Sequence, residues 1–291
     1  MNQTNRRHLE VATFTHPGLS GRNNEDRYAV AAYAGPAKKP VLFAVLCDGI
    51  GGHRAGEIAA ELAVDSIVRA VADSDGTDPL GTMEMAIHGA SRAIASRAAS
   101  HPDEAGMGAT CACLWVAGDR LFTAHVGDSR IYLLQGGKIH RLTVDHTWVQ
   151  EAIEIGLIAP EQARDHPNVH VLRRHLGSSA PPVVDFRQLQ EGHQNGGRAR
   201  RRQGAKLKPG DIVMACTDGL TDCVPDHEIL RLATTHEALG SIARDLVMEA
   251  NERGGQDNTT VVLIRAPFAA APGRVGRNTP LRRRLRHSPS A

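Results

Sequence analysis

The stretch VLCDGIGGHRAGE, residues 45–57, joins an apolar run to an aspartate, three glycines and the start of an Ala-rich helical pattern. A lone Asp-Gly pair is a common turn, because glycine adopts positive φ and aspartate hydrogen-bonds its own backbone. The same construction recurs in IVMACTDGL, residues 212–220, where a second strand-like run reaches Asp218 and Gly219. Two strands that both end on Asp-Gly can direct Asp48 and Asp218 toward one point.

Other acidic residues stand where further strand-like runs begin or end. Asp26 closes the sequence NNED before one run, Asp128 lies in a Gly-Asp-Ser-Arg turn between two runs, and Asp257 precedes the last run. Hard cations such as Mg²⁺ and Mn²⁺ prefer carboxylate and carbonyl oxygens, whereas clustered carboxylates without a cation repel one another. Convergence of these residues would therefore imply a metal site. The predicted donors are Asp26, Asp48, Asp218 and Asp257, with the carbonyl of Gly49.

The order of the apolar patterns predicts an α+β fold. Several strand-like runs are joined by short Gly-containing turns, which favours antiparallel sheets, and the strands cluster between helices instead of alternating with them. Strands are expected at 9–14, 28–34, 41–47, 110–117, 120–126, 130–134, 183–188, 211–216 and 259–265. Helices are expected at 55–72, 83–98, 145–156, 226–233 and 238–254.

Composition narrows the class of protein. The 291 residues are 41% hydrophobic, which is enough for a substantial core. Aromatic residues make up only 3%, so no stacking platform for nucleic-acid bases is expected. The sequence has no Walker A or Gly-x-Ser-x-Gly motif, which argues against nucleotide-cradle and serine-nucleophile chemistry.

The same composition predicts a cytoplasmic location. No apolar run approaches the ~20 residues of a membrane helix, and the N-terminus MNQTNRRHLE lacks the apolar core of a signal peptide. The five cysteines form no Cys-x-x-Cys pair, which is typical of a reducing compartment.

Two basic segments interrupt the pattern. Residues 191–206, EGHQNGGRARRRQGAK, are predicted to form a long surface loop. Residues 268–291 contain six arginines, no acid and no periodic apolar face, and are predicted to be disordered. Both are interpreted as solvated segments, with contact to an anionic surface or partner as the alternative.

An ordered set of motifs resembles one family. NNED (23–26), CDGIGGHRAGE (47–57), GMGAT (106–110), HVGDSRIYLL (125–134), LTVDHTWVQ (142–150), LKPGDIVMACTDGLTD (207–222) and GGQDNTTVVLI (254–264) occur in that sequence order. Together they resemble the bacterial form of the metal-dependent serine/threonine phosphatases of the protein phosphatase 2C type. The resemblance covers residues 9–267, leaving residues 1–8 as an N-terminal extension and 268–291 as a tail.

The resemblance implies an αββα sandwich, in which two antiparallel sheets lie face to face with helices outside and two Mn²⁺ or Mg²⁺ ions at one rim. It implies that Asp48 bridges the ions, that the Gly49 carbonyl holds one, and that Asp218 and Asp257 hold the other. Asp26 would order metal-bound water, Asp128 would hold a third ion, and residues 145–167 would form a flap. Phosphoserine and phosphothreonine would be hydrolysed by in-line attack of water.

Two positions depart from the family pattern. The arginine that usually anchors phosphate falls on Gly21, with Arg22 one place along, so either Arg22 serves or the phosphate is held differently. Eukaryotic relatives carry a histidine directly after Asp-Gly, where this sequence has Ile50. His53 is a candidate substitute, and its alternative role is capping or loop packing. Structural roles, not catalytic ones, are predicted for four further residues. Glu57 is expected to interact with a helix dipole, Arg130 to pair with a nearby acid, and His146 and His166 to belong to the flap.

The resemblance also implies partners, namely phosphorylated proteins, Ser/Thr kinases and the substrates of those kinases. It implies no specific nucleic acid and no membrane span. Two alternatives stay open: a non-catalytic phosphoprotein-binding module on the same fold, which the missing arginine makes plausible, and a hydrolase of small phosphate esters.

Overall fold

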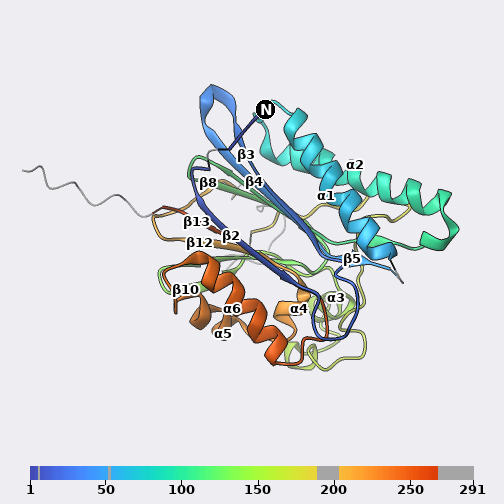
Figure 1. Ribbon diagram of the computed structural model, residues 1–291. Helices are drawn as coiled ribbons and strands as arrows, with labels where there is room; N and C mark the ends of the chain where they lie inside the picture. The colour runs from blue at the N-terminus through green and yellow to red at the C-terminus, as the bar shows by residue number, and fades with distance from the viewer. Residues whose placement is uncertain (6, 52–53, 189–202, 268–291) are drawn as a thin grey trace, which may run out of the picture.

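Two antiparallel sheets lie face to face between two layers of helices in the computed structural model, which describes residues 1–5, 7–51, 54–188 and 203–267 (Figure 1). The first sheet has the order β1 (Asn2–Thr4), β3 (Arg27–Ala34), β4 (Pro40–Cys47), β7 (Cys111–Ala117), β8 (Arg120–Val126), β11 (Ala205–Lys206). The second has the order β10 (Lys138–Arg141), β9 (Arg130–Gln135), β12 (Ile212–Cys216), β13 (Thr259–Arg265), β2 (Glu10–His16). A short pair, β5 (Gly49–Ile50) and β6 (Gly108–Ala109), lies beside the first sheet's end.

Helices cover the outer faces of both sheets. The helices α1 (Ala55–Asp73) and α2 (Pro79–Ser100) pack on the first sheet, while α5 (Asp226–Ala233) and α6 (Leu239–Glu252) pack on the second. The shorter helices are α3 (Trp148–Glu154) and α4 (Asp218–Thr221), with 3₁₀ turns at Pro36–Lys38, Pro102–Glu104 and Pro160–Gln162. The predicted αββα sandwich is therefore confirmed.

Strand alternation divides the core into three apolar layers. In β4, Phe43 and Val45 face α1 and α2, while Leu42 and Leu46 face the second sheet, because successive side chains of a strand point to opposite sides. Burial on both faces explains why this strand reads as an uninterrupted apolar run. The third layer lies between the second sheet and α5 and α6.

One expected strand is wrong and one expected helix is too long. Residues 183–188 form only an isolated bridge between Asp185 and His125. The Asp185 carboxylate accepts a hydrogen bond from the Arg187 N–H at 2.7 Å, which turns the chain away from β8. The helix expected at 145–156 begins at Trp148, because Thr147 caps it by accepting from the Gln150 N–H.

The predicted N-terminal extension and the end of the first basic segment each contribute an edge strand to the first sheet. Within residues 1–8, β1 pairs antiparallel with β3 and so adds an edge strand to the first sheet. The basic segment at 191–206 ends in β11, which pairs with β8, whereas residues 191–202 and the tail 268–291 lie outside the described residues. Within the described ranges, no helix is long and apolar enough to cross a bilayer.

Candidate metal centre

Carboxylates from both sheets meet at one end of the sandwich. Asp48 follows β4 and Asp218 follows β12 by two residues, so each marks the end of a buried strand. Asp26 directly precedes β3, whose first residue pairs with the last residue of β4. The Thr217 hydroxyl donates to Asp26 Oδ2 at 3.0 Å, which ties the first sheet to the second at this end.

The clustered carboxylates perturb one another. Burial, followed by the charges of neighbouring carboxylates, raises the pKa of Asp218 to about 7. Burial also raises the pKa of Asp26 to about 7, although hydrogen bonds from Thr260 and Thr217 oppose the shift. The pKa of Asp48 lies well above its usual range for the same reason, with Asp26 and Asp218 as its strongest charged neighbours. The cluster therefore holds negative charge that lacks a compensating partner.

Two buried oxygens in this cluster are orphaned. Asp26 Oδ1 and Asp218 Oδ1 have no hydrogen-bond partner among the described residues. Buried polar atoms are nearly always satisfied, so an orphaned carboxylate oxygen indicates an absent ligand. Oxygen donors with excess negative charge suit a hard divalent cation, and the predicted donor set fits that group.

Asp48 and Gly49 are held in place by close packing. The Asp48 N–H donates to Thr110 Oγ1 at 3.0 Å, and the Thr110 N–H donates to the Asp48 carbonyl at 2.8 Å. A Cβ added at Gly49 would lie 2.1 Å from the Gly56 carbonyl oxygen, so only glycine allows this approach of β5 to α1. The backbone that carries the Gly49 carbonyl is thus fixed beside the acidic cluster.

Asp257 lies at the solvent-exposed side of the cluster, just before β13. The next residue, Asn258, is buried and joins β13 to the NNED segment. Its side-chain amide donates to the carbonyls of Pro17 and Asn23, and its oxygen accepts from the Glu25 N–H at 2.7 Å. Sequence reasoning missed Asn258, although a polar residue at the start of a buried strand was a usable signal.

Asp128 belongs to a second acidic group, which shares Asp218 with the first. Burial, then the charges of Asp218 and Asp145, raise the pKa of Asp128 well above its usual range. One ligand atom from each of His170, Asp218 and Asp222 lies within 4.8 Å of the others. Asp222 and His170 were not predicted, although the four-residue spacing in DGLTD places Asp222 one helical turn after Asp218.

The predicted substrate-binding residues are less well placed. Arg22 is exposed and close enough to Glu25 for its charge to oppose the rise that burial, Asp257 and Glu57 impose on the Glu25 pKa. It therefore lies at the outer edge of the acidic cluster. Gly21 has open space around it, with φ +74°. His53 lies outside the described residues.

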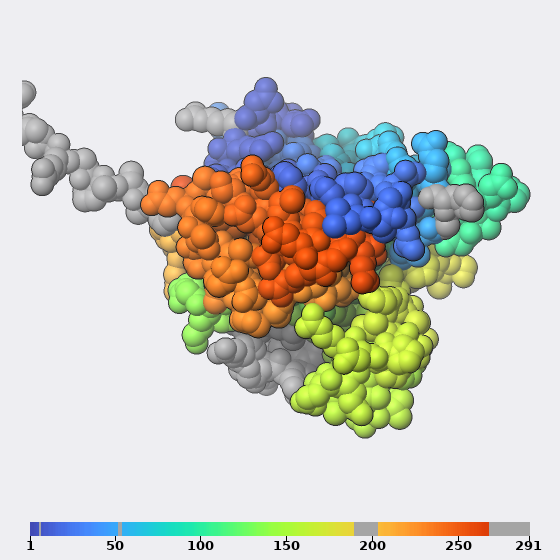
Figure 2. Space-filling view, turned by 60° about the horizontal axis from the view of Figure 1, so that its bottom comes forward, coloured from blue at the N-terminus to red at the C-terminus, as the bar shows by residue number. Residues whose placement is uncertain are grey.

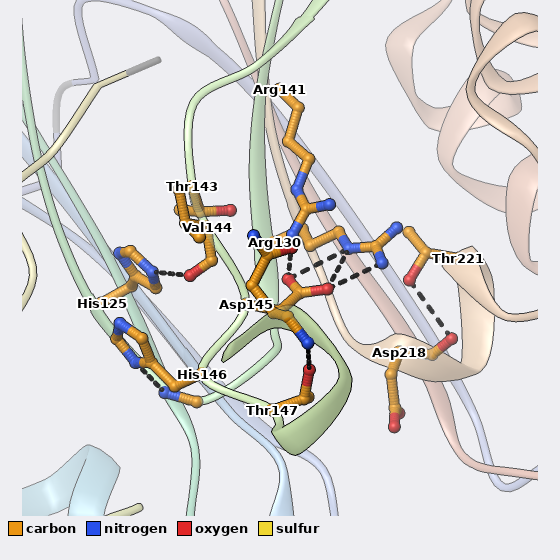
Figure 3. Close-up of polar contacts among 12 residues, drawn as sticks. His125, Arg130, Arg141, Thr143, Val144, Asp145, His146, Thr147, Asp218 and Thr221 are labelled. Carbon is orange, nitrogen blue, oxygen red and sulfur yellow. Dashed lines mark hydrogen bonds and ion pairs between the residues drawn. The ribbon is translucent and has the colours of Figure 1, made fainter. Parts of the chain in front are cut away.

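The side chains predicted to have structural roles make contacts near the acidic cluster. Arg130 does pair with an acid, Asp145, at 2.8 Å, and Arg141 contacts the same carboxylate (Figure 3). His166 stacks on Trp148 with ring centroids 4.7 Å apart, and both residues lie in the segment predicted to be the flap. His146, at the start of the same segment, is buried and accepts a hydrogen bond from the Gly127 N–H in the turn that carries Asp128. In Figure 2 the yellow-green segment that includes residues 150–170 forms a lobe beside the body of the protein.

Comparisons with known proteins agree with this geometry. A family model described as protein phosphatase 2C matches residues 19–252. The serine/threonine protein phosphatase PstP of Mycobacterium tuberculosis is 35% identical over 88% of this chain, which spans 44% of that relative's length. Protein phosphatase PhpP of Streptococcus pneumoniae is 32% identical over 88% of this chain and 97% of its own.

Solved structures show the same arrangement of elements. The S. agalactiae serine/threonine phosphatase has a TM-score of 0.76 at 31% identity and covers 88% of this chain and 99% of its own. The catalytic domain of PstP in complex with two manganese ions has a TM-score of 0.69 at 34% identity and covers 88% and 97%. With the match of the family model and the shared sandwich, this chain belongs to the protein phosphatase 2C family.

Proposed function

We propose that this protein is a metal-dependent phosphatase that hydrolyses phosphoserine and phosphothreonine in proteins. The observation that carries the proposal is the meeting of Asp26, Asp48 and Asp218 at one rim, where two buried carboxylate oxygens lack a hydrogen-bond partner in the described part of the chain. Such a group has no stabilising role by itself, because unpaired buried charge destabilises a fold. Family membership supports the same activity.

Asp48, the Gly49 carbonyl, Asp218 and Asp257 are the protein donors that would hold two Mn²⁺ or Mg²⁺ ions. Asp128 would hold a third ion together with Asp218, and the position of Asp222 makes it a further donor there. When bound, such cations lower the pKa of water and neutralise charge on a transferring phosphoryl group.

Asp26 has the geometry to orient the attacking water. Its Oδ2 is anchored by the Thr217 hydroxyl, which leaves Oδ1 free to accept a hydrogen bond from water in the cluster. The rigid strand ends keep this oxygen aimed at the site. No covalent intermediate with a protein nucleophile is required.

Arg22 is proposed to bind the substrate phosphate from the rim. An exposed guanidinium beside Glu25 can reach an incoming anion without first breaking a buried ion pair. Arg22→Ala is expected to raise KM for a phosphopeptide more than it lowers kcat, with Arg22→Lys intermediate. An unchanged KM would show that the phosphate is held by other groups.

Phosphorylated proteins, including Ser/Thr kinases and the substrates of those kinases, are the proposed partners, because the relatives PstP and PhpP are protein phosphatases. The cytoplasm is the proposed location, since all five cysteines are free thiols, as is usual in a reducing compartment.

Hydrolysis of a phosphothreonine peptide tests the proposal. We expect Mn²⁺-dependent turnover by the wild type, loss of turnover with chelator, and loss with Asp218→Ala. Asp103→Ala removes an exposed acid from a surface turn and serves as the matched control. Turnover that survives both chelation and Asp218→Ala would contradict the metal mechanism. Mn²⁺ binding without turnover would favour the binding module, and faster hydrolysis of a sugar phosphate would favour the small-ester hydrolase.

A further inference from the structure

A buried imidazole lies directly beneath the turn that carries Asp128. The Gly127 N–H donates to His146 Nδ1 at 3.0 Å, and the His146 N–H donates to the Gly127 carbonyl at 3.0 Å. Both backbone polar groups of Gly127 are therefore held by one residue 19 positions away. His146 is only 3% exposed, so water does not compete for these bonds.

The opposite edge of the ring faces a fixed carboxylate. Because Nδ1 accepts a hydrogen bond, the proton of the neutral ring is on Nε2, which lies 3.3 Å from Asp185 Oδ2. Arg187 in turn donates to Asp185 from Nε at 2.7 Å and from its backbone N–H at 2.7 Å. Burial alone would raise the pKa of Asp185, but the hydrogen bonds from His146 and Arg187 outweigh burial and lower this pKa. The carboxylate thus selects the ring tautomer that leaves Nδ1 free to accept.

A second histidine fixes the plane of the ring. His125 stacks on His146 with centroids 4.7 Å apart and an interplanar angle of 9°. Burial lowers the pKa of His125 to about 4, so this ring is neutral, and its Nε2 lies 2.8 Å from the Val144 carbonyl (Figure 3). The His146 ring is therefore constrained by its face as well as by both nitrogens.

The other side of the turn is pressed against the residue that holds Asp48. A Cβ added at Gly127, where φ is +106°, would lie 2.7 Å from the Thr110 side chain. Thr110 exchanges hydrogen bonds with Asp48 and lies 2.7 Å from Ser129 Oγ. The turn is confined between Thr110 and His146, and the distance between the Asp48 and Asp128 carboxylates depends on both.

The cluster of His125, His146 and Asp185 has the spacing of a metal-binding group. Its polar atoms already have partners, however. Nδ1 of His146 bonds to Gly127, Nε2 of His125 lies against a backbone carbonyl, and the Arg187 guanidinium occupies Asp185 Oδ2 at 2.6 Å. Arg174 Nη1 also lies 3.4 Å from His146 Nε2 and adds positive charge. These contacts favour a positioning role over cation binding.

We propose that His146 and Asp185 form a positioning pair that sets the Gly127–Asp128 turn and so aims the Asp128 carboxylate at Asp218. The proposal rests on the proposed function of Asp128 as a metal donor. His146 and Asp185 touch neither substrate nor metal. They act through the backbone of Gly127, as outer hydrogen-bond partners of a metal ligand do.

The tautomer of His146 in the metal-free wild type tests the first step without any variant. Nitrogen-15 NMR is expected to show Nε2 protonated and Nδ1 accepting a hydrogen bond, with the Gly127 amide proton shifted downfield. A ring protonated on Nδ1 would overturn the proposal. Because this measurement is made with chelator present, its outcome is independent of whether the protein is a phosphatase.

Two substitutions test the roles of the two ring nitrogens of His146 separately. The asparagine of His146→Asn places an amide oxygen near the position of Nδ1 and keeps the hydrogen bond from the Gly127 N–H. The longer side chain of His146→Gln reaches toward Asp185 and loses the hydrogen bond from Gly127. We expect His146→Gln to raise the Mn²⁺ concentration needed for half-maximal phosphopeptide hydrolysis by about 10- to 100-fold, and His146→Asn to stay close to wild type. Calorimetric titration with Mn²⁺ should show the same ranking, and His166→Gln in the flap is the matched control.

A role limited to filling space predicts the opposite ranking, because glutamine is nearer to histidine in volume than asparagine is. Equal losses in both variants, or a larger loss in His146→Asn, would therefore overturn the proposal. Failure of the proposed function would be recognised separately, as absence of turnover in the wild type while the NMR and calorimetric rankings remain as expected.

Discussion

Asp26→Asn is expected to stabilise the metal-free protein, and to do so more at pH 8 than at pH 5. Asp26 is 3% exposed and its Oδ1 lacks a partner among the described residues. Burial and the neighbouring acids Asp218 and Asp257 raise its pKa from 3.8 to about 7. Asparagine removes the charge and still accepts a hydrogen bond from the Thr217 hydroxyl.

The pH dependence of this stabilisation follows from the upward shift of the Asp26 pKa. A carboxyl group whose pKa is higher in the folded state binds protons more tightly there, so acid favours folding. Its favourable contribution is complete below pH 3.8 and is lost as the pH rises through about 7. At about 1.4 kcal/mol for each pKa unit, the raised pKa of Asp26 costs about 4 kcal/mol at pH 8, where the folded group is ionised, and about 2 kcal/mol at pH 5, where folding requires uptake of a proton. These are upper values, since neighbouring carboxylates share the proton.

Urea unfolding followed by circular dichroism, with chelator at both pH values, measures the effect. The variant Asp103→Asn neutralises an exposed acid and is expected to leave the free energy of unfolding nearly unchanged. Saturating Mn²⁺ should reverse the order, because the wild-type carboxylate then has a cation nearby. If Asp26→Asn were no more stable than wild type at pH 8 in chelator, the cluster would not carry the unfavourable charge assigned to it.

Three further substitutions test packing and ion pairing in the fold. Gly219→Ala should lower the thermal midpoint and the affinity for Mn²⁺, because its Cβ would lie 2.1 Å from the Asn258 carbonyl oxygen; Gly240→Ala, with open space in α6, should instead stabilise by about 0.5–1 kcal/mol. Asp145→Ala should destabilise by about 1–3 kcal/mol in urea unfolding, because it leaves the half-buried Arg130 guanidinium without its carboxylate. Retention of wild-type stability by Asp145→Ala would show that Arg130 finds another partner.

The layers of the fold and the cluster of acids were predictable because their signals are local. A strand buried on both faces is apolar throughout, as β4 is, and a polar residue directly after such a strand marks the rim of the sheet. Asp48 and Asp218 occupy such rim positions in different sheets, and the face-to-face packing of the two sheets then brings them together. The pairing of Arg130 with an acid was predictable in kind, since a half-buried cation favours an acidic partner, although Asp145 could not be identified from spacing alone.

The errors came from side chains that compete with the backbone. The residues around Val183 and Val184 have the composition of a strand, but the Asp185 carboxylate bonds to the Arg187 N–H and ends the pairing. Helical periodicity extends through Asp145, yet Thr147 caps α3 two residues later. Such bonds depend on one polar side chain and leave the apolar pattern unchanged.

The partners of the polar residues that hold the acids were beyond prediction, because these partners are distant in sequence. Thr217 joins Asp26 across the two sheets, Asn258 joins β13 to the NNED segment, and His146 holds the turn before Asp128. Each of these contacts is made at the end of the sandwich where the strands of both sheets stop. The carboxylates can be found from strand ends, but their mutual distances are set by hydrogen bonds that only the folded arrangement creates. A substitution in one of these polar residues should therefore alter metal affinity without removing any donor.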